Sequence, residues 1–214
     1  MFKFLNLFFF FYSCLANANS LEENLLLNLK NELNEHEFTG IVSIQRNDAE
    51  IFLFQSDKRI TDSSVFWIGS VSKQFAAAAI LSLVDKGLLQ LDDNIFEILN
   101  PNNHLNLGKT PACSVRQVLQ HTCGLRKKNA CMHLDSNNPN DQESYIKCAL
   151  ALEREFEPGT SYSYSNIGYN LIGIVISRLS QMCAEQYLQQ QFFNPLSMSH
   201  SGIDIKRNKY AWES

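Results

Sequence analysis

The run over residues 70–86 limits the fold of this chain more than any other feature. It contains four consecutive alanines at 76–79, then Ile80 and Leu81, and the Gly87 that follows is a natural C-terminal stop for a helix. A helix whose middle is apolar on every side has no polar face left to contact water. The sequence therefore predicts a buried central helix with other elements packed around it.

Two β-rich runs precede this helix, over residues 40–45 and 50–55, and residues 46–49 between them are typical of a hairpin turn. An isolated two-stranded sheet is only marginally stable in water, so the hairpin needs other elements to cover it. The order of elements predicts an α+β fold, in which a helical lobe packs against an antiparallel sheet of which only the first two strands are present. Further helices are expected over 20–36, 95–99, 115–120, 142–152, 166–179 and 184–193.

The first eighteen residues differ from the rest of the chain. Lys3 supplies a positive charge, residues 4–12 are almost entirely apolar, and an Ala-Asn-Ala stretch of small residues follows. This pattern is typical of a cleaved secretory signal. It predicts a signal peptide over 1–18, one domain over 19–214 and export to the periplasm or the extracellular space. The alternative is an uncleaved helix next to the membrane. No later segment is long and apolar enough for a transmembrane helix.

The overall charge argues against a nucleic-acid partner. The sequence has 18 Lys and Arg against 22 Asp and Glu, a formal net charge of −4, whereas proteins that bind nucleic acid carry a basic patch. No spacing of Cys and His predicts a zinc site, and no metal or other cofactor is expected.

Five cysteines remain once the predicted signal is removed: Cys113, Cys123, Cys131, Cys148 and Cys183. An odd number leaves at least one thiol free or paired outside the chain. An exported protein can form disulfides, and Cys123, Cys131 and Cys148 flank one polar segment in which a disulfide is expected. The connectivity stays open at this point.

The spacing of Ser70 and Lys73 points to nucleophilic chemistry. A serine hydroxyl becomes a good nucleophile when a neighbour takes its proton, and a lysine can take it when burial or positive potential favours the neutral amine. Residues i and i+3 share one face of a helix, so the two side chains meet if the helix begins at Ser70. The N-terminus of such a helix also suits a developing oxyanion.

The S-x-x-K pattern alone is a weak signal, because a helix start with a solvated lysine gives the same letters. Ser72 is a rival nucleophile, but it points to a different helix face from Lys73.

A second pair of polar residues, Tyr164 and Asn166, follows the turn expected at Pro158 and Gly159. Two residues apart at the end of a turn, both side chains can face one cleft. The Tyr164 phenol could carry a proton between the serine and a leaving group, and the Asn166 amide could hold a substrate carbonyl and orient Lys73. The alternative is structural, since Tyr and Asn are common in turns and Asn166 could be a helix N-cap.

Five segments resemble, in the same order, segments of the serine β-lactamase and penicillin-binding protein superfamily, and most closely its class C β-lactamase-like branch. They lie over residues 66–75, 87–93, 115–125, 158–169 and 196–198. Cys123 stands where the third segment usually has Ser, and Ser197 replaces the usual Gly of the last. The hairpin matches the first two strands of that family, so the resemblance covers nearly all of the chain after the signal.

The resemblance implies a β-lactamase/transpeptidase-like fold and a serine hydrolase that forms an acyl-enzyme. It implies Ser70 as the nucleophile, Lys73 as the base, and Tyr164 and Asn166 as the second catalytic element. The implied partner is a small-molecule or peptide acyl substrate: a D-alanyl peptide, a β-lactam or an ester. A histidine near a serine suggests a triad, but here the lysine already fills the role of base. The resemblance instead implies that His121 hydrogen-bonds to the backbone of a structural turn beneath the site.

One motif of that superfamily is not found. A Lys-Thr-Gly sequence, expected on a later strand that faces the nucleophile, does not occur between residues 166 and 214, and the His-x-Gly at 200–202 directly follows the fifth segment and does not fit that strand motif. We therefore expect a fragment, or the product of a gene shortened by an early stop, with weak turnover. Three functions stay open: an exported peptidase-like or β-lactamase-like acyl-transfer enzyme, an esterase on the same fold, and a catalytically impaired remnant or ligand-binding relative.

Overall fold

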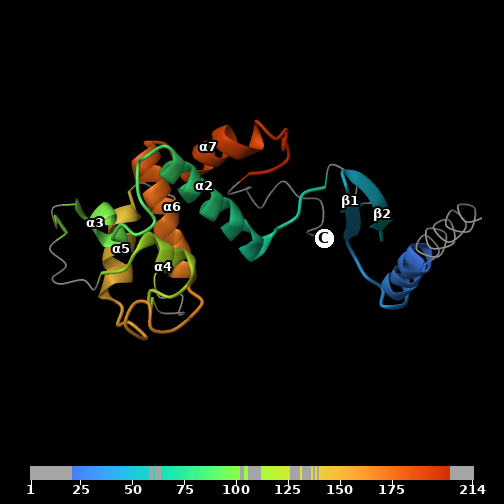
Figure 1. Cartoon of the computed structure of the whole chain (residues 1–214), viewed down its shortest axis with the longest axis horizontal. Coiled ribbons are helices and arrows are strands. Elements are labelled where there is room, and N and C mark those ends of the chain that lie inside the picture. Colours follow the sequence, from blue (N-terminus) through green and yellow to red (C-terminus); the bar gives the residue numbers. More distant parts are fainter. Residues whose placement is uncertain are drawn as a thin grey trace, which may run out of the picture. The chain divides into compact units, whose positions relative to one another are not determined.

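The chain divides into two units, Met1–Ser64 and Val65–Ser214, whose helices and strands are drawn in Figure 1. The computed structural model describes residues 21–57, 60, 64–101, 104–105, 112–125, 131, 136, 138 and 140–202. The predicted signal peptide and Ser20, the first residue of the helix expected over 20–36, lie outside these residues.

The predicted hairpin is present in the first unit. Strand β1 (Ile41–Arg46) pairs with β2 (Ala49–Gln55) in a two-stranded antiparallel sheet, after a helix over residues 21–35. Asn47 and Asp48 form the turn with φ of 50° and 63°. Two consecutive residues with positive φ make the type I′ arrangement, whose twist matches that of the paired strands.

The register of the sheet is continuous except at one point. Ile41 lies opposite Gln55 at one end, and the register shifts between Ile44 and Gln45. Phe54 is the buried residue of β2.

The second unit is helical, and α6 is its central element. Helix α6 contacts α2, α3, α4, α5 and α7, and it runs among them in Figure 1. Its buried apolar side chains are Ile167, Leu171, Ile172, Ile174, Val175 and Ile176. The elements of the unit, in order, are the 3₁₀ turn η1 (Gly69–Ser72), α2 (Lys73–Asp85), α3 (Ile95–Leu99), α4 (Val115–Leu119), α5 (Gln142–Ala151), α6 (Asn166–Ser180), α7 (Ala184–Leu188) and the π-helical turn η3 (Gln189–Phe193).

Helix α2 differs from its prediction as the buried central helix. It buries Ala79, Ile80 and Leu83, whereas Leu81 is 48% exposed in the described structure. The alanine run makes α2 apolar on every side, but each alanine gains little by burial because its side chain is small. The large branched residues of α6 gain more, and they take the centre.

The remaining helices match their predicted positions closely. Helix α3 has the expected bounds, and α4, α5 and α6 each end within one residue of the expected position. The segment expected as one helix over 184–193 instead changes from α-helix to a π-helical turn after Leu188.

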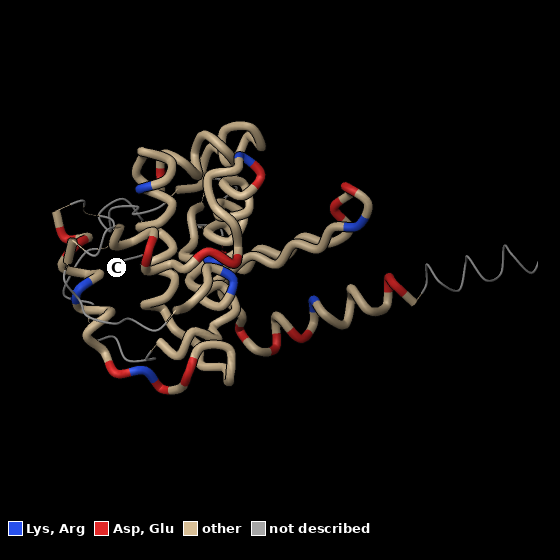
Figure 2. The backbone as a smooth tube through the Cα atoms, turned by 60° about the vertical axis from the view of Figure 1, so that its left-hand side comes forward, with Lys and Arg blue, Asp and Glu red and all other residues tan. Residues whose placement is uncertain are grey.

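The charged residues of the described chain are scattered. Figure 2 shows Lys and Arg positions interspersed with Asp and Glu positions along the backbone. Among the described helices, none combines the length and the apolar character needed to cross a bilayer.

Two disulfides hold the second unit together, Cys113–Cys123 and Cys131–Cys148, while Cys183 is a free and exposed thiol. The expectation of a disulfide around the polar segment is confirmed by Cys131–Cys148, and the odd cysteine is Cys183. Cys123 pairs with Cys113, a connection that the sequence left open.

Replacing Cys131 and Cys148 together with Ser is expected to lower the free energy of unfolding by about 3 kcal/mol, because the disulfide closes a loop across a separation of 17 residues. Urea denaturation followed by circular dichroism measures the change. Cys183→Ser is the matched control and should leave the midpoint nearly unchanged, since the thiol is exposed and unpaired. An equal loss in both variants would contradict the assignment.

Candidate active site

Ser70 and Lys73 meet across a single 3₁₀ turn. The sequence predicts an α-helix from Ser70, but residues 69–72 form η1 and the α-helix begins at Lys73. In a 3₁₀ helix the side chains at i and i+3 eclipse each other. The Lys73 ammonium accordingly donates to Ser70 Oγ at 3.3 Å. Gly69 has a φ of +50°, which is the left-handed conformation that glycine adopts without steric cost.

Tyr164 and Asn166 complete a cluster with this pair. Tyr164 Oη lies 2.6 Å from Ser70 Oγ, and the Lys73 ammonium donates to Asn166 Oδ1 at 2.9 Å. The loop over 161–165 and the first residue of α6 carry the two side chains to the start of α2. The structure therefore brings together all four residues singled out from the sequence.

The start of α6 explains why Asn166 is available to Lys73. Ser165 is the N-cap of α6, and its hydroxyl accepts a hydrogen bond from the Gly168 amide at 3.2 Å. Asn166 is the first helical residue rather than the cap. Its amide side chain is thus free of the capping role considered above, and it contacts the ammonium instead.

The charge of Lys73 sets the electrostatics of the cluster. Its Nζ lies 4.9 Å from the ring centroid of Tyr164 and 5.3 Å from that of Tyr169. The interaction with Lys73, and then the hydrogen bond with Ser70, lower the pKa of the Tyr164 phenol, since both favour the phenolate. Burial, followed by the neighbouring Tyr164, raises the pKa of Tyr169. Tyr169 therefore stays protonated, and its hydroxyl donates to the Leu119 carbonyl at 3.0 Å.

His121 forms hydrogen bonds with the backbone, as the resemblance implies. Its Nδ1 accepts a hydrogen bond from the Ser165 amide at 3.1 Å, and its carbonyl accepts one from the Ser163 amide at 3.0 Å. Burial, and then the charge of Lys73, lower the pKa of the imidazole. The neutral ring is the form that can accept through Nδ1.

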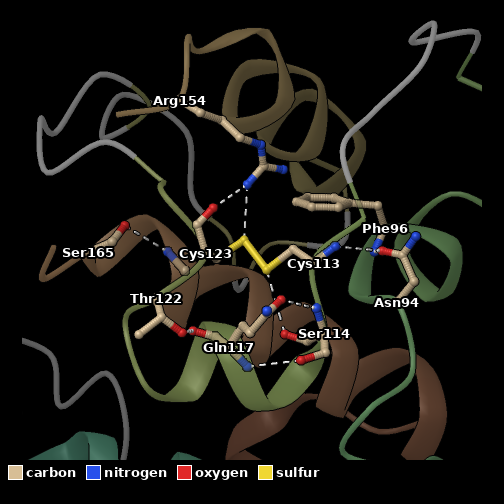
Figure 3. The surroundings of a disulfide bond; sticks show 10 residues. Asn94, Phe96, Cys113, Ser114, Gln117, Thr122, Cys123, Arg154 and Ser165 are labelled. Carbon is tan, nitrogen blue, oxygen red and sulfur yellow. Dashed lines mark hydrogen bonds between the residues drawn. A yellow bond between two sulfur atoms is a disulfide. The ribbon is translucent and has the colours of Figure 1, made fainter. Parts of the chain in front are cut away.

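A disulfide fixes the turn that follows His121, and Figure 3 shows the surroundings of this disulfide. Cys123, two residues further on, is bonded to Cys113 and takes the place of the usual Ser. Arg154 donates to both the carbonyl and the sulfur of Cys123, and its guanidinium lies 4.9 Å from the ring centroid of Phe96. The turn is thereby tied to segments on either side of it in the sequence.

Arg154 carries no sequence signal that would have found it. It is a single basic residue between an expected helix and an expected turn, and only the folded chain brings it to Cys123. Ser114 and Gln117, by contrast, form a capping box at the start of α4, a pattern that is readable from their spacing.

The described residues contain no group of three or more His, Cys, Asp or Glu side chains arranged to hold a metal ion. The side chains that do converge are a hydroxyl, an ammonium, a phenol and an amide. This set can activate a serine and move a proton.

Comparisons with known proteins identify the family of this chain. Residues 28–212 match the family described as Beta-lactamase. Protein flp of Staphylococcus aureus (strain MRSA252) is 23% identical over 201 residues, which cover 90% of this chain and 40% of flp.

Two solved structures are similar as well. SurE with D-Leu has a TM-score of 0.65 and 28% identity, covering 83% of this chain and 41% of SurE. A mutant class C beta-lactamase has a TM-score of 0.65 and 21% identity, covering 85% of this chain and 50% of the enzyme; this likeness concerns the fold.

The chain spans less than half the length of the curated relatives that it matches, as with the 40% of flp. Within that span the family match extends over residues 28–212, and it includes every residue of the cluster. The chain belongs to the beta-lactamase family, and so to a superfamily of serine acyl-transfer hydrolases.

Proposed function

We propose that this protein is an exported serine acyl-transfer hydrolase of the β-lactamase/D-Ala-D-Ala carboxypeptidase type, with Ser70 as the acylated nucleophile. The observation that carries the proposal is the position of Ser70 Oγ, 2.6 Å from Tyr164 Oη and 3.3 Å from Lys73 Nζ. The phenol, once ionised, is a proton acceptor within reach of this hydroxyl, and the adjacent ammonium favours its ionised form.

The acylation step follows from these contacts. Ser70 Oγ attacks the substrate carbonyl carbon, and its single proton passes to the Tyr164 phenolate, the basic member of the Lys73–Tyr164 pair, whose negative charge the Lys73 ammonium stabilises. The new C–O bond forms as the carbonyl π electrons move onto oxygen. When the tetrahedral intermediate collapses, the bond to the leaving group breaks, and Tyr164 returns the proton to that group. Water then attacks the acyl-enzyme by the same route and releases the acid.

Asn166 has a supporting role in this proposal. Its Oδ1 accepts from the Lys73 ammonium at 2.9 Å, which orients the lysine toward Ser70. Its NH₂ group remains able to donate to a substrate carbonyl.

The proposed substrates share a carbonyl with an attached leaving group: a D-alanyl peptide, a β-lactam or a small ester. Similarity to SurE, whose structure contains D-Leu, supports an acyl donor built on a D-amino acid. An esterase would use the same Ser70 step. Comparing the hydrolysis rates of a D-alanyl peptide, a β-lactam and an aryl ester therefore distinguishes an esterase from a peptidase or β-lactamase.

Export is also part of the proposal. The pattern of residues 1–18 supports it, and so do the two disulfides in the second unit. Disulfides persist in oxidising compartments and are rare in the cytosol.

Labelling with a fluorescent penicillin tests the proposed function. The full chain should acquire a covalent label, and Ser70→Ala should abolish it. Ser72→Ala is the matched control, because Ser72 is another exposed serine on the same 3₁₀ turn, and this variant should label like the unmodified protein. Absence of a label that depends on Ser70 would refute acyl transfer to penicillin, and the same assay with a D-alanyl thioester and an aryl ester extends the test to the other acyl donors.

A further inference from the structure

Two backbone amides, one on each side of Tyr164, donate to the same residue. The Ser163 amide donates to the His121 carbonyl at 3.0 Å, and the Ser165 amide donates to His121 Nδ1 at 3.1 Å. We propose that His121 is the positioning residue that holds the Tyr164 phenol against Ser70. This inference rests on the proposed function, because it concerns the geometry of the same proton transfer.

The imidazole ring also limits the movement of the Tyr164 side chain. The ring centroids of His121 and Tyr164 lie 4.4 Å apart with an interplanar angle of 36°. Tyr162 meets the same imidazole edge-on, with centroids 6.0 Å apart. His121 thus contacts the backbone on both sides of Tyr164 and also its aromatic ring.

His121 is itself held in an uncommon conformation. Its φ is +60°, in the left-handed region that few residues other than glycine adopt, although His is enriched there relative to most. The Thr122 amide donates to the Gln117 carbonyl at 2.8 Å, and Cys123 is fixed by its disulfide and by Arg154. A backbone conformation of this kind persists only where the surroundings impose it, which is typical of functional sites.

The hydrogen bond to Ser165 depends on the protonation state of His121. The titratable groups that face the imidazole are Lys73 of α2, Tyr162 and Tyr164 of the preceding loop and Tyr169 of α6. Burial first, and the charge of Lys73 second, place the pKa of His121 below its ordinary value of 6.5. The neutral ring therefore prevails at pH 7.

Acid should release Tyr164. Protonation converts Nδ1 from an acceptor to a donor, so the bond from the Ser165 amide is lost as the pH falls through the pKa of His121 in the folded protein. Linkage has the same sign: because the pKa is lowered on folding, the unfolded state binds more protons below about pH 6.5, and stability falls there.

Two variants separate positioning from packing. His121→Asn keeps an acceptor near the position of Nδ1, tolerates a positive φ and takes up no proton. His121→Phe keeps a ring and removes the acceptor. Penicillin acylation of the full chain is measured between pH 5 and 8. His121→Phe should acylate about 10–100-fold more slowly, since a misplacement of about 1 Å can cost 10²-fold. His121→Asn should stay within about threefold of the unmodified protein at pH 7.5. Its rate relative to the unmodified protein should then increase as the pH falls through the pKa of His121, because the titration of Tyr164 is common to both proteins.

Amide hydrogen exchange of the unacylated protein provides a readout that does not need catalysis. The Ser165 amide should exchange faster in His121→Phe than in His121→Asn, and faster in the unmodified protein as the pH falls through the pKa of His121 after correction for the intrinsic rate. If His121→Phe does not fold, the exchange and pH profiles of the other two proteins still decide. If no protein is acylated, the proposed function fails, while the exchange data still test the hydrogen bond.

The inference is overturned if a folded His121→Phe acylates at the unmodified rate, or if the rate of His121→Asn relative to the unmodified protein is the same at pH 5 as at pH 8. It is equally overturned if the Ser165 amide exchanges at the same corrected rate in all three proteins.

Discussion

Tyr164→Phe should slow the acylation of Ser70 by about 10²–10⁴-fold, which is the usual contribution of a positioned acid or base. The substitution removes the oxygen that lies 2.6 Å from Ser70 Oγ and keeps the ring that packs on His121. The loss should therefore appear in the rate of adduct formation rather than in the stability of the fold. Stopped-flow measurement of penicillin acylation gives that rate.

The pH dependence supplies a second part of the same prediction. Lys73 and then Ser70 lower the pKa of Tyr164 below its ordinary value of 10.0, and the phenolate is the form that accepts a proton. Acylation should therefore rise with pH toward the pKa of Tyr164, and this rise should be absent in Tyr164→Phe. Tyr162→Phe is the matched control, because Tyr162 lies in the same loop, is 64% exposed and meets only the edge of His121. A rate in Tyr164→Phe equal to that of the control would contradict the role of the phenol.

Lys73→Met should cause a loss of similar size, because its ammonium stabilises the Tyr164 phenolate that takes the Ser70 proton. Residues that act as a unit give strongly non-additive losses. The double variant Lys73→Met with Tyr164→Phe should therefore be little slower than either single variant. If the loss of acylation rate in the double variant equals the product of the two single losses, the two groups act separately.

Gly124→Ala should lower the free energy of unfolding by about 4 kcal/mol, the sum of a left-handed penalty and overpacking. Gly124 has a φ of +73°, and a Cβ there would overlap the carbonyl oxygen of Phe156. That oxygen belongs to the backbone and cannot rotate away. The Glu155 amide also donates to the Gly124 carbonyl at 2.9 Å, so the two segments cannot separate without losing this bond.

Gly87→Ala is the control for this substitution. Gly87 has a nearly equal φ of +70°, but a Cβ there would meet no atom within 4 Å. Gly87→Ala should lower the free energy of unfolding only by the penalty of the left-handed conformation, about 1–2 kcal/mol. Thermal and urea denaturation of both variants measure the difference, and equal losses at the two glycines would contradict the close approach of residues 124 and 156.

Much of this fold could be predicted from the sequence because the signals are local. Asn47 and Asp48 favour the positive φ of a hairpin turn, and Gly87 marks the end of α2 by its left-handed conformation. The residues of the site could be predicted for a different reason. Ser70 and Tyr164 each lie in a segment that resembles one family. Several such segments in the same order make the resemblance far more specific than any one of them.

The other features depend on contacts between distant segments. The pairing of Cys113 with Cys123 and the position of Arg154 follow from the packing of loops, which has no sequence period. The 3₁₀ turn at Ser70 depends on the conformation of Gly69, which the helical pattern of α2 conceals. The two hydrogen bonds of His121 join it to residues more than forty positions away.

The central claim is that Ser70 forms an acyl-enzyme, and mass spectrometry of the protein after incubation with a penicillin tests it most directly. Opening of the β-lactam ring releases no leaving group, because the amine stays attached to the acyl chain. The intact mass of the protein should therefore increase by the whole mass of the penicillin. Peptide mapping should then locate the adduct on Ser70, and Ser70→Ala should show no increase. An unchanged mass, or an adduct on another residue such as Ser72, would contradict the account.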